Sequence, residues 1–462
     1  SSPFWLMPSS HSGFAAMRVH TWTPAARSLK HEVDAGAKRR GVAFITVCNL
    51  AGEKLPLPPV SIALSGSDLI ALVTQHDSVL ALTSPAMPAV KLFFGAGPLR
   101  ASQTLADQGV PEKAVMTYVA RRVTADEQAL AVRRLLQGQR DVDDEASMIL
   151  ASIREITVRR RDNVTNLSMI KNLQTLTFDG YYDQSMDSAT LPSSLRSVTF
   201  GHAYDQSLER VALPTGLQNL TFGRAYNQSL EKVTLPSGLQ SLTFGFAYNQ
   251  SLEKVTLPSG LQNLTFGYFY NQSLQGVTLP SGLRTLTFGD AYDKSLEMVT
   301  LPRGLQSLTF GDTYNRSLEM VTLPSGLQSL TFGDAYNKSL EKVTLPSGLQ
   351  NLTFGDTYNK SLEMVRLPSG LQNLTFGYAY NQSLQRVTLP SSLKNLTFGH
   401  AFNQSLEMVT LPGSLQTLSF GNAFNHSLEK LTLPSGLQNL TFGYAYYQNL
   451  KRVNLPSGLQ KF

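Results

Sequence analysis

The chain has 462 residues, of which 42% are hydrophobic, and it carries a formal net charge of +6. This length indicates several domains or a repeat array, and the apolar content argues against a disordered chain. Because no apolar run approaches the roughly 20 residues of a membrane-spanning helix and the cations are dispersed, we expect neither a membrane nor a nucleic-acid partner.

Residues with catalytic or ligating chemistry are few. The one cysteine, Cys48, allows no intramolecular disulfide and no cysteine-based zinc site, and the seven histidines lack a ligand spacing. The sequence has no nucleophile–base pair, phosphate-binding loop or dinucleotide-binding glycine pattern. We therefore predict a non-enzymatic protein without catalytic residues, metal or cofactor. The single thiol favours a cytoplasmic location, with the nucleus as the alternative.

Residues 1–39 form the first predicted segment. Its first acidic residue is Glu32, and it has no positively charged region followed by an apolar core, which argues against a secretory signal. We predict a disordered or truncated leader. The acid-poor composition, with Ser, Ala and Arg, keeps an organelle transit segment as the alternative.

Residues 40–122 are predicted to form a small α+β module. GVAFITVCNLAGEKLPL has two apolar β-rich runs around an Asn/Gly turn, which indicates a hairpin. A helix capped by Ser67 or Asp68 is expected, and strands are expected over Val90–Phe94 and Ala114–Ala120, with a short helical piece between them. Hairpin, helix, strand, short helix and strand is the element order of a β-grasp domain.

This module also resembles a known family. KLFFGAGPLRASQTLADQGVPEKAVMTYVAR is similar to the C-terminal half of ubiquitin in its strand, glycine turn, "TL-D" segment and closing strand. The chain continues past Arg122 as VTADEQ, without the terminal Gly-Gly of a conjugated modifier. The resemblance therefore implies a built-in ubiquitin-like docking module that engages ubiquitin-system components. A β-grasp-like unit without that role is the alternative.

Residues 123–168 are predicted to form a helical connector and the N-terminal cap of the array that follows. Thr124 and Glu127 have the spacing of a capping box, and Gly138 separates two helical stretches within residues 124–156. We expect the apolar positions of these helices to cover the first coil.

Residues 169–462 repeat one motif. The pair Leu-Pro recurs every 22 residues from Leu191 to Leu455, which gives thirteen repeats and a partial one. A fixed period of this length is typical of a solenoid. Each copy has two apolar triplets of the form L-x-x-L-x-(L/F), and each triplet is followed by a Gly or Pro. We predict two short strands per coil, stacked into parallel sheets with a step of about 4.8 Å.

Three recurring columns are predicted to be structural. Glycine occupies one turn position from Gly201 to Gly443, where we expect no room for a Cβ atom. Tyr or Phe fills a second column from Tyr204 to Tyr446, which favours a core stack over a ligand cage. Asn, or Asp in some copies, fills a third column, where its side chain can satisfy backbone groups of its own and neighbouring coils.

The repeat itself resembles a known family. L-P-S-x-L-x-x-L-T-F-G-x-A-(Y/F)-N-Q-S-L is similar to the FNIP repeat, a member of the leucine-rich-repeat superfamily, and more distantly to BspA-type repeats. Ser stands where the FNIP repeat commonly has Pro after "FNQ". The resemblance implies a leucine-rich-repeat-like parallel β-solenoid of 22-residue coils that acts as a protein-binding scaffold.

Two columns vary, one directly after the turn glycine and one four residues later, and they hold the candidate binding residues. The candidates are Phe246, Tyr268, Asp290, Asp312, Asp334, Asp356, Tyr378 and Tyr444 in the first column, and Lys294, Arg316, Lys338 and Lys360 in the second. The four coils with Asp are the four with Lys or Arg, which favours a self-neutralising solvated surface over a charged protein-binding stripe. Near-equivalent carboxylates matched by cations argue against calcium binding or catalysis.

The predicted architecture is an α+β ubiquitin-like (β-grasp) domain, a helical connector and a leucine-rich-repeat-like parallel β-solenoid. The predicted function is an interaction scaffold whose solenoid binds a protein partner, with the aromatic residues of the variable column as anchors. A solenoid that binds carbohydrate or another polymer through an aromatic column is the alternative.

Overall fold

The computed structural model of the chain describes residues 42–48, 54–55, 60–61, 88–94, 97–98, 113–122, 125–138 and 144–460. The chain divides into two compact units, residues 1–156 with 165–173 and residues 157–164 with 174–462. The predicted leader and the helix predicted after Ser67 or Asp68 lie outside the described residues.

The first unit contains a six-stranded sheet. Its strands are β1 (Val42–Cys48), β2 (Lys54–Leu55), β3 (Val60–Ser61), β4 (Pro88–Phe94), β5 (Gly97–Pro98) and β6 (Lys113–Arg122). The order across the sheet is β2-β1-β6-β4-β5, and β3 pairs with β1. β1 and β2 form the predicted antiparallel hairpin, and β1 lies parallel to β6. β4 and β6 include the two other predicted strands.

Two helices follow, α4 (Ala125–Leu136) and α5 (Asp144–Ala151). Gly138, with a φ of +88°, lies in the turn after α4, as the sequence predicts for a helix interruption. The expected helix over residues 124–156 is wrong at its end, because Glu155–Val158 forms strand β7. Its Ile and Val are buried and alternate with exposed residues, which is the period of a strand. A short 3-10 helix, η2 (Leu167–Met169), comes next.

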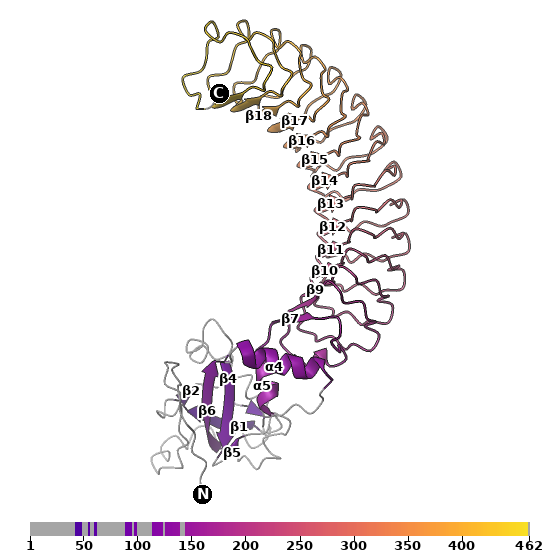
Figure 1. Cartoon of the computed structure of the whole chain (residues 1–462), viewed down its shortest axis with the longest axis vertical. Helices are drawn as coiled ribbons and strands as arrows, with labels where there is room; N and C mark the ends of the chain where they lie inside the picture. The colour runs from indigo at the N-terminus through magenta and orange to yellow at the C-terminus, as the bar shows by residue number, and fades with distance from the viewer. Residues whose placement is uncertain are drawn as a thin grey trace. The chain divides into compact units, whose positions relative to one another are not determined.

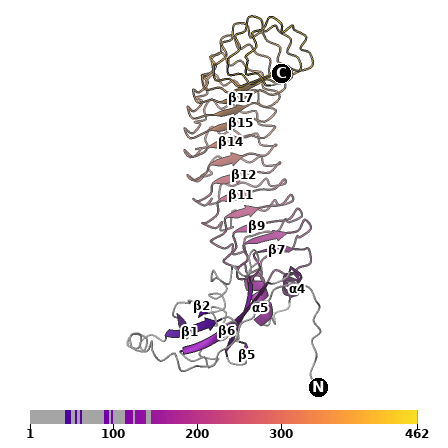
Figure 2. The same cartoon turned by 90° about the vertical axis from the view of Figure 1, so that its left-hand side faces the viewer.

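The second unit is a stack of coils joined by one fourteen-stranded sheet that runs from β7 to β20 (Figures 1 and 2). After β7 its strands are β8 (Thr175–Phe178), β9 (Ser197–Thr199), β10 (Asn219–Thr221), β11 (Ser241–Thr243), β12 (Asn263–Thr265), β13 (Thr285–Thr287), β14 (Ser307–Thr309), β15 (Ser329–Thr331), β16 (Asn351–Thr353), β17 (Asn373–Thr375), β18 (Asn395–Thr397), β19 (Thr417–Ser419) and β20 (Asn439–Thr441). Neighbouring strands are parallel, and each residue pairs with the residue 22 positions later. The predicted repeat period and parallel sheet are confirmed.

The prediction of two strands per coil is wrong, because only the first triplet of each coil forms a strand in the described part of the chain. The second triplet still packs into the core, since Leu208 and Val211 are buried and the third leucine is buried in most later coils, as Leu235 is. Its backbone hydrogen bonds close within the coil, as in the bond from the Val211 N–H to the Leu208 carbonyl. The Pro that follows has no N–H to donate, so a second ladder cannot continue there.

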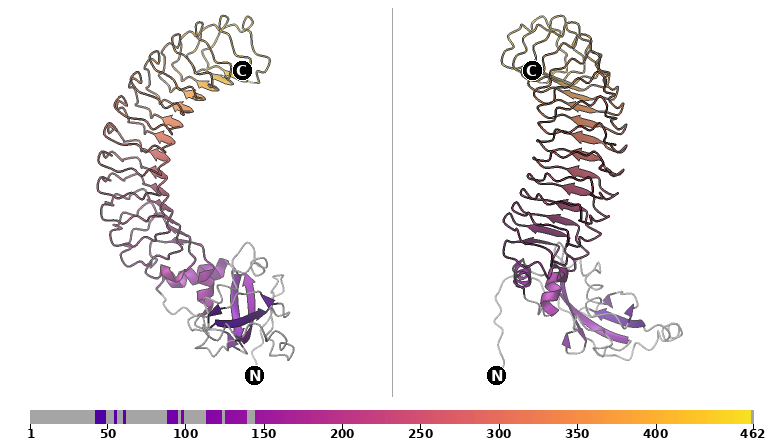
Figure 3. Two further views of the ribbon diagram at one scale, coloured as in Figure 1. Left: turned by 180° about the vertical axis from the view of Figure 1, so that it is seen from behind. Right: turned by 90° about the vertical axis from the view of Figure 1, so that its right-hand side faces the viewer.

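The coil step widens with distance from the sheet. Parallel strands lie about 4.8 Å apart. The rings of Phe332 and Phe354 are 5.6 Å apart, and those of Tyr336 and Tyr358 are 6.1 Å apart. A stack whose step grows across its width must curve, and the strands line its inner face (Figures 1 and 3).

The predicted aromatic core stack is confirmed. Tyr336 is 0% exposed and lies nearly parallel to the next tyrosine, at 8°. Its hydroxyl has no hydrogen-bond partner among the described residues, and nine other fully buried tyrosines share this state. Phe402 and Phe424 hold the same column position without a hydroxyl. The column therefore requires a ring, and the hydroxyl adds an unpaired polar atom to the core.

We expect Tyr336→Phe to leave the free energy of unfolding unchanged or to raise it, by up to about 1–3 kcal/mol, because it removes a buried unpaired hydroxyl. Tyr336→Leu is the control, which should lower stability by creating a cavity. Urea unfolding followed by circular dichroism measures both. A loss of more than about 1 kcal/mol in the Phe variant would show that the hydroxyl has a partner.

The Asn column forms a hydrogen-bonded ladder, as predicted. The Asn359 N–H donates to the Asn337 side-chain oxygen at 3.0 Å, and the Asn337 N–H donates to Asn315 at 3.1 Å. Asp293 serves the same purpose in its coil, because its carboxylate accepts from the Asn315 N–H at 3.0 Å. Each side chain thus pairs a backbone donor of the following coil.

Replacing Asn337 with Ala leaves the part-buried Asn359 N–H without its acceptor, so we expect a loss of about 1–2 kcal/mol. Asn337→Asp keeps the acceptor in the form that Asp293 already uses and should lose less than half as much. Amide hydrogen exchange at Asn359, together with the urea midpoint, measures the effect. Equal losses in the two variants would contradict the ladder.

Candidate interaction surface

The inner face of the curved stack is chemically uniform. In each three-residue strand the central residue is buried and the two flanking side chains point outward. From β9 to β20 these outward positions hold Ser, Asn or Thr and then Thr, with Ser419 as the one change in the second position. The residue before each strand is Gln in nine coils, and Arg196, Arg284 and Lys394 replace it in three. This face therefore presents a nearly invariant surface of hydroxyl and amide groups.

Sequence variation concentrates instead on the turn that follows each strand. The first residue after the turn glycine lies there, and most of its side chains are exposed. We call this column the edge ladder: His202, Arg224, Phe246, Tyr268, Asp290, Asp312, Asp334, Asp356, Tyr378, His400, Asn422 and Tyr444. The candidate residues of the first variable column thus all lie on one edge of the stack, on a turn rather than on the sheet.

Four side chains near the beginning of the edge ladder form an aromatic cluster. Phe246 stacks on Tyr268 at 4.7 Å between ring centroids, and the Arg224 guanidinium lies 4.6 Å from the Phe246 ring centre. Phe269 contacts both rings edge-on, at 4.8 and 5.0 Å. Tyr268 and Phe269 remain 43% and 48% exposed. The cluster is a solvent-facing apolar patch that extends over three coils.

Sequence reasoning missed Phe269. The signal was present, because this position is Ala in nine of the twelve coils from Ala203 to Ala445 and Thr in two others, at 313 and 357. A ring at 269 therefore departs from the repeat as strongly as any residue of the edge ladder. Its side chain completes the patch that Phe246 and Tyr268 begin.

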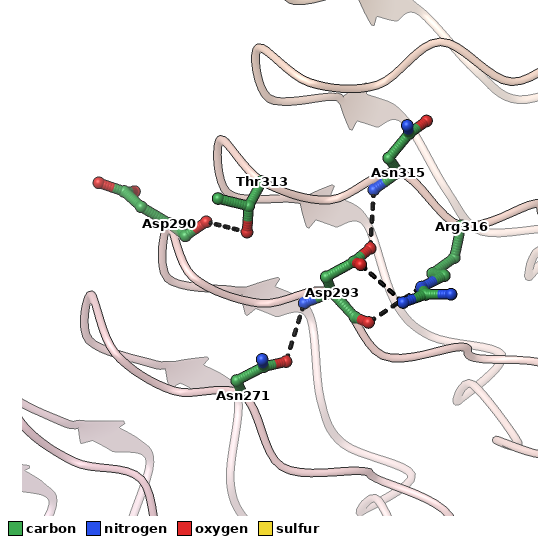
Figure 4. A network of polar contacts seen from close by, with 6 residues as sticks. All are labelled: Asn271, Asp290, Asp293, Thr313, Asn315 and Arg316. Carbon is green, nitrogen blue, oxygen red and sulfur yellow. Dashed lines mark hydrogen bonds and ion pairs between the residues drawn. The ribbon is translucent and has the colours of Figure 1, made fainter.

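The four aspartates at the centre of the edge ladder form no ion pair in the described part of the chain, and neither do Lys294, Lys338 and Lys360. The fourth cation, Arg316, binds Asp293 of the Asn column at 2.7 Å. Figure 4 shows Asp290 and Arg316 on opposite sides of Asp293, with the Asp290 carboxylate pointing away. The predicted neutralisation therefore does not consist of ion pairs between the two columns, and Arg316 reaches toward the Asn column instead.

The end of the edge ladder is again aromatic. Tyr378 stacks on His400 at 5.0 Å, and the His400 ring nitrogen is 3.1 Å from the Asn422 amide. Tyr378 and Tyr444 are exposed, at 56% and 89%. The acidic run thus lies between two aromatic segments.

A second charged surface lies on the turn inside the second triplet, between its first and second apolar residues. Here a Glu of one coil pairs with a Lys or Arg of the next, at 2.5–3.2 Å. We call these pairs the back ladder: Glu209–Lys232, Glu231–Lys254, Glu319–Lys342, Glu363–Arg386 and Glu407–Lys430. In four coils a methionine takes the place of the Lys or Arg of the back ladder. These methionines are Met298, Met320, Met364 and Met408, and their side chains are 66–72% exposed. Five of the nine glutamates in the glutamate column thus form ion pairs, whereas none of the four aspartates of the edge ladder does in the described part of the chain.

The described residues contain no group of three or more His, Cys, Asp or Glu side chains that could hold a metal ion. Among the same residues, none of the helices has the length and apolar character needed to cross a bilayer.

Comparison with known proteins places the array among repeat proteins. A family model described as FNIP Repeat matches six consecutive stretches, the first five of two coils each and the last shorter: residues 204–247, 248–291, 292–335, 336–379, 380–423 and 424–461. No curated protein matches the chain.

Two solved structures show different degrees of likeness. The crystal structure of CroV588, described as a novel circular LRR protein structure, is 38% identical over 63% of this chain, with a TM-score of 0.59. The chain spans 43% of the length of that protein. The pneumococcal vaccine antigen PcpA is 15% identical over 66% of this chain and 78% of its own, and its TM-score of 0.22 supports no structural argument.

Proposed function

The chain belongs to the FNIP repeat family, and from this premise we propose that it is a non-enzymatic scaffold whose solenoid binds a protein partner through the edge ladder. The observation that carries this proposal is the contrast between surfaces. The inner face repeats nearly the same hydroxyls and amides, with three cations among them, whereas the edge ladder exposes carboxylates that form no ion pair among the described residues and lie between two aromatic segments. Exposed aromatic residues and Arg are the side chains that most often anchor protein interfaces.

The structure gives less support to a solenoid that binds a polysaccharide or another extended polymer than to one that binds a protein. The regular aromatic column that such a ligand could stack on is buried in the core. The exposed rings are confined to a few coils and stand partly edge-on to one another, as Tyr268 and Phe269 do at 89°. A protein surface, which is irregular, fits such an arrangement better than an extended repeat does.

The second part of the proposal concerns the predicted ubiquitin-like module, residues 40–122. We propose that this module binds ubiquitin-system components. What supports this is the strand order β2-β1-β6-β4-β5 with a parallel central pair, which is the order of a β-grasp sheet, together with the sequence resemblance to ubiquitin. A titration of the full chain with a ubiquitin-interacting helical peptide tests it. Binding in the micromolar range is expected, and no binding would remove this part of the proposal.

The test of the scaffold function is a selection of random peptides displayed on phage against the folded full chain. Peptides that are enriched are then measured on two variants that use residues already present in the repeat. The edge variant is Tyr268→Asn with Phe269→Ala, and the sheet variant is Asn351→Thr with Asn373→Thr. We expect the edge variant to bind the peptides at least about tenfold more weakly than the parent, which corresponds to a loss of about 1.4 kcal/mol in binding free energy. We expect the sheet variant to bind them as the parent does. Failure to enrich any peptide, or a loss confined to the sheet variant, would overturn the proposal.

A further inference from the structure

We infer that the edge ladder recognises one extended, bipartite segment of a partner protein, with apolar or proline residues at one end and Lys or Arg over the rest. This inference rests on the proposed function and specifies its partner. Two different surfaces adjoin without interruption along the edge, the aromatic cluster and then the four aspartates.

The aromatic cluster supplies the anchor. Phe246 is partly covered by its neighbours, and Tyr268 and Phe269 stand at 89° to each other beside it. Because both of these rings are exposed, they offer apolar surface against which a compact apolar side chain or a proline ring can pack, as aromatic-lined surfaces do with proline-rich segments. Arg224, over the outer face of Phe246, closes the far side of the cluster and disfavours a cation there.

The aspartates determine the charge of the remaining segment. Their carboxylates have no ion pair in the described part of the chain, so a cation of the partner gains an attraction that no side chain of the array already supplies. The Asp290 carboxylate points away from Arg316, on the other side of Asp293 (Figure 4). A basic segment that follows the edge ladder can therefore approach the aspartates without meeting that cation.

The spacing along the edge fits an extended chain. Neighbouring rings of the ladder lie 4.7 and 5.0 Å apart, so the five steps from Phe246 to Asp356 cover about 25 Å. An extended segment rises about 3.3 Å per residue, so about eight residues span this distance. Two or three of them would occupy the cluster, and alternate residues of the remainder would face the aspartates.

The experiment is a fluorescence-anisotropy titration of the full chain with a labelled peptide, Trp-Pro-Pro-Gly-Lys-Ser-Lys-Ser-Lys-Ser. Matched peptides replace each Lys with Glu, or replace Trp and both Pro with Ser. Matched protein variants are Phe269→Ala, which installs the residue of nine other coils, and the four aspartates changed together to Asn, the residue that Asn422 already places in the ladder. Circular dichroism confirms that each variant keeps the fold of the parent.

The inference predicts that the parent peptide binds and that each of these altered peptides and protein variants, taken alone, weakens binding at least about tenfold. Added salt should weaken the parent pair and leave the four-Asn variant nearly unaffected. No binding of the parent peptide, or equal binding to all variants, would overturn the inference. If displayed peptides of other composition still required the edge ladder, the scaffold function would stand and only this inference would fail.

Discussion

Replacing Gly333 with Ala is expected to lower the free energy of unfolding by at least about 3 kcal/mol, a loss that single substitutions reach only through a specific structural conflict. A Cβ at this position would lie 2.1 Å from the Gly311 carbonyl oxygen and 2.3 Å from its carbonyl carbon. The obstacle is backbone of the preceding coil, so no side-chain rotation relieves it. The turn glycine is thus required by the close approach of two coils, since its φ is not positive.

The matched control is Gly304→Ala, whose Cβ would be 3.4 Å from its nearest neighbour, the Ser281 carbonyl oxygen. Ser392 holds the same position of the repeat, which shows that a side chain fits there. We expect a change within about 0.5 kcal/mol for this variant. Urea unfolding of the two proteins under identical conditions measures the difference, and comparable stabilities would refute the close-approach account.

The array is also expected to unfold steeply as the pH rises above about 10. Burial raises the pKa of each column tyrosine, to about 12 for Tyr182 and further for those inside the stack. The unfolded state releases these protons from pH 10.0 upward while the folded state retains them. Folding therefore loses about 1.4 kcal/mol per pH unit for each tyrosine, and this contribution is complete below pH 10 and declines above it. When several coils unfold together, the losses of folding free energy from their tyrosines add.

The control separates tyrosine ionisation from the simultaneous titration of surface lysines. Tyr314→Phe, Tyr336→Phe and Tyr358→Phe together remove three ionisable groups from the core without removing a ring. The pH dependence of the urea midpoint should flatten for this variant. The tyrosinate absorbance should include a step that coincides with the loss of the circular dichroism signal, and this step should be smaller in the variant than in the parent. A midpoint that stays constant between about pH 9 and 12 in the parent would contradict the buried, raised pKa values.

The structural columns could be predicted from the sequence because each coil has copies of itself as neighbours. A residue such as Asn337 can only meet Asn315 and Asn359 above and below it, so its ladder follows from the period alone. The same logic predicts the tyrosine stack and the tight glycine turn. It does not predict the backbone path of the second triplet, where the Pro of each coil prevents a ladder that the apolar spacing otherwise favours.

The sequence predicts which residues make up the candidate surface, but not which partners their side chains contact. The matching of Asp and Lys columns indicates neutralisation, but a turn decides where each side chain points, and Arg316 reaches Asp293 rather than the edge. Phe269 was overlooked because it lies one residue beside the variable column. The back ladder was overlooked because its Glu and Lys lie in consecutive positions, and the pairing partner is in the next coil.

Carboxylate footprinting tests the central claim most directly. The full chain is labelled with a carbodiimide and an amine, with and without its tightest selected peptide, and mass spectrometry reads the modification of each acidic residue. We predict that the peptide protects Asp290, Asp312, Asp334 and Asp356, and leaves the glutamates of the back ladder as reactive as before. Protection of the back-ladder glutamates, or of no acidic residue at all, would contradict recognition through the edge ladder.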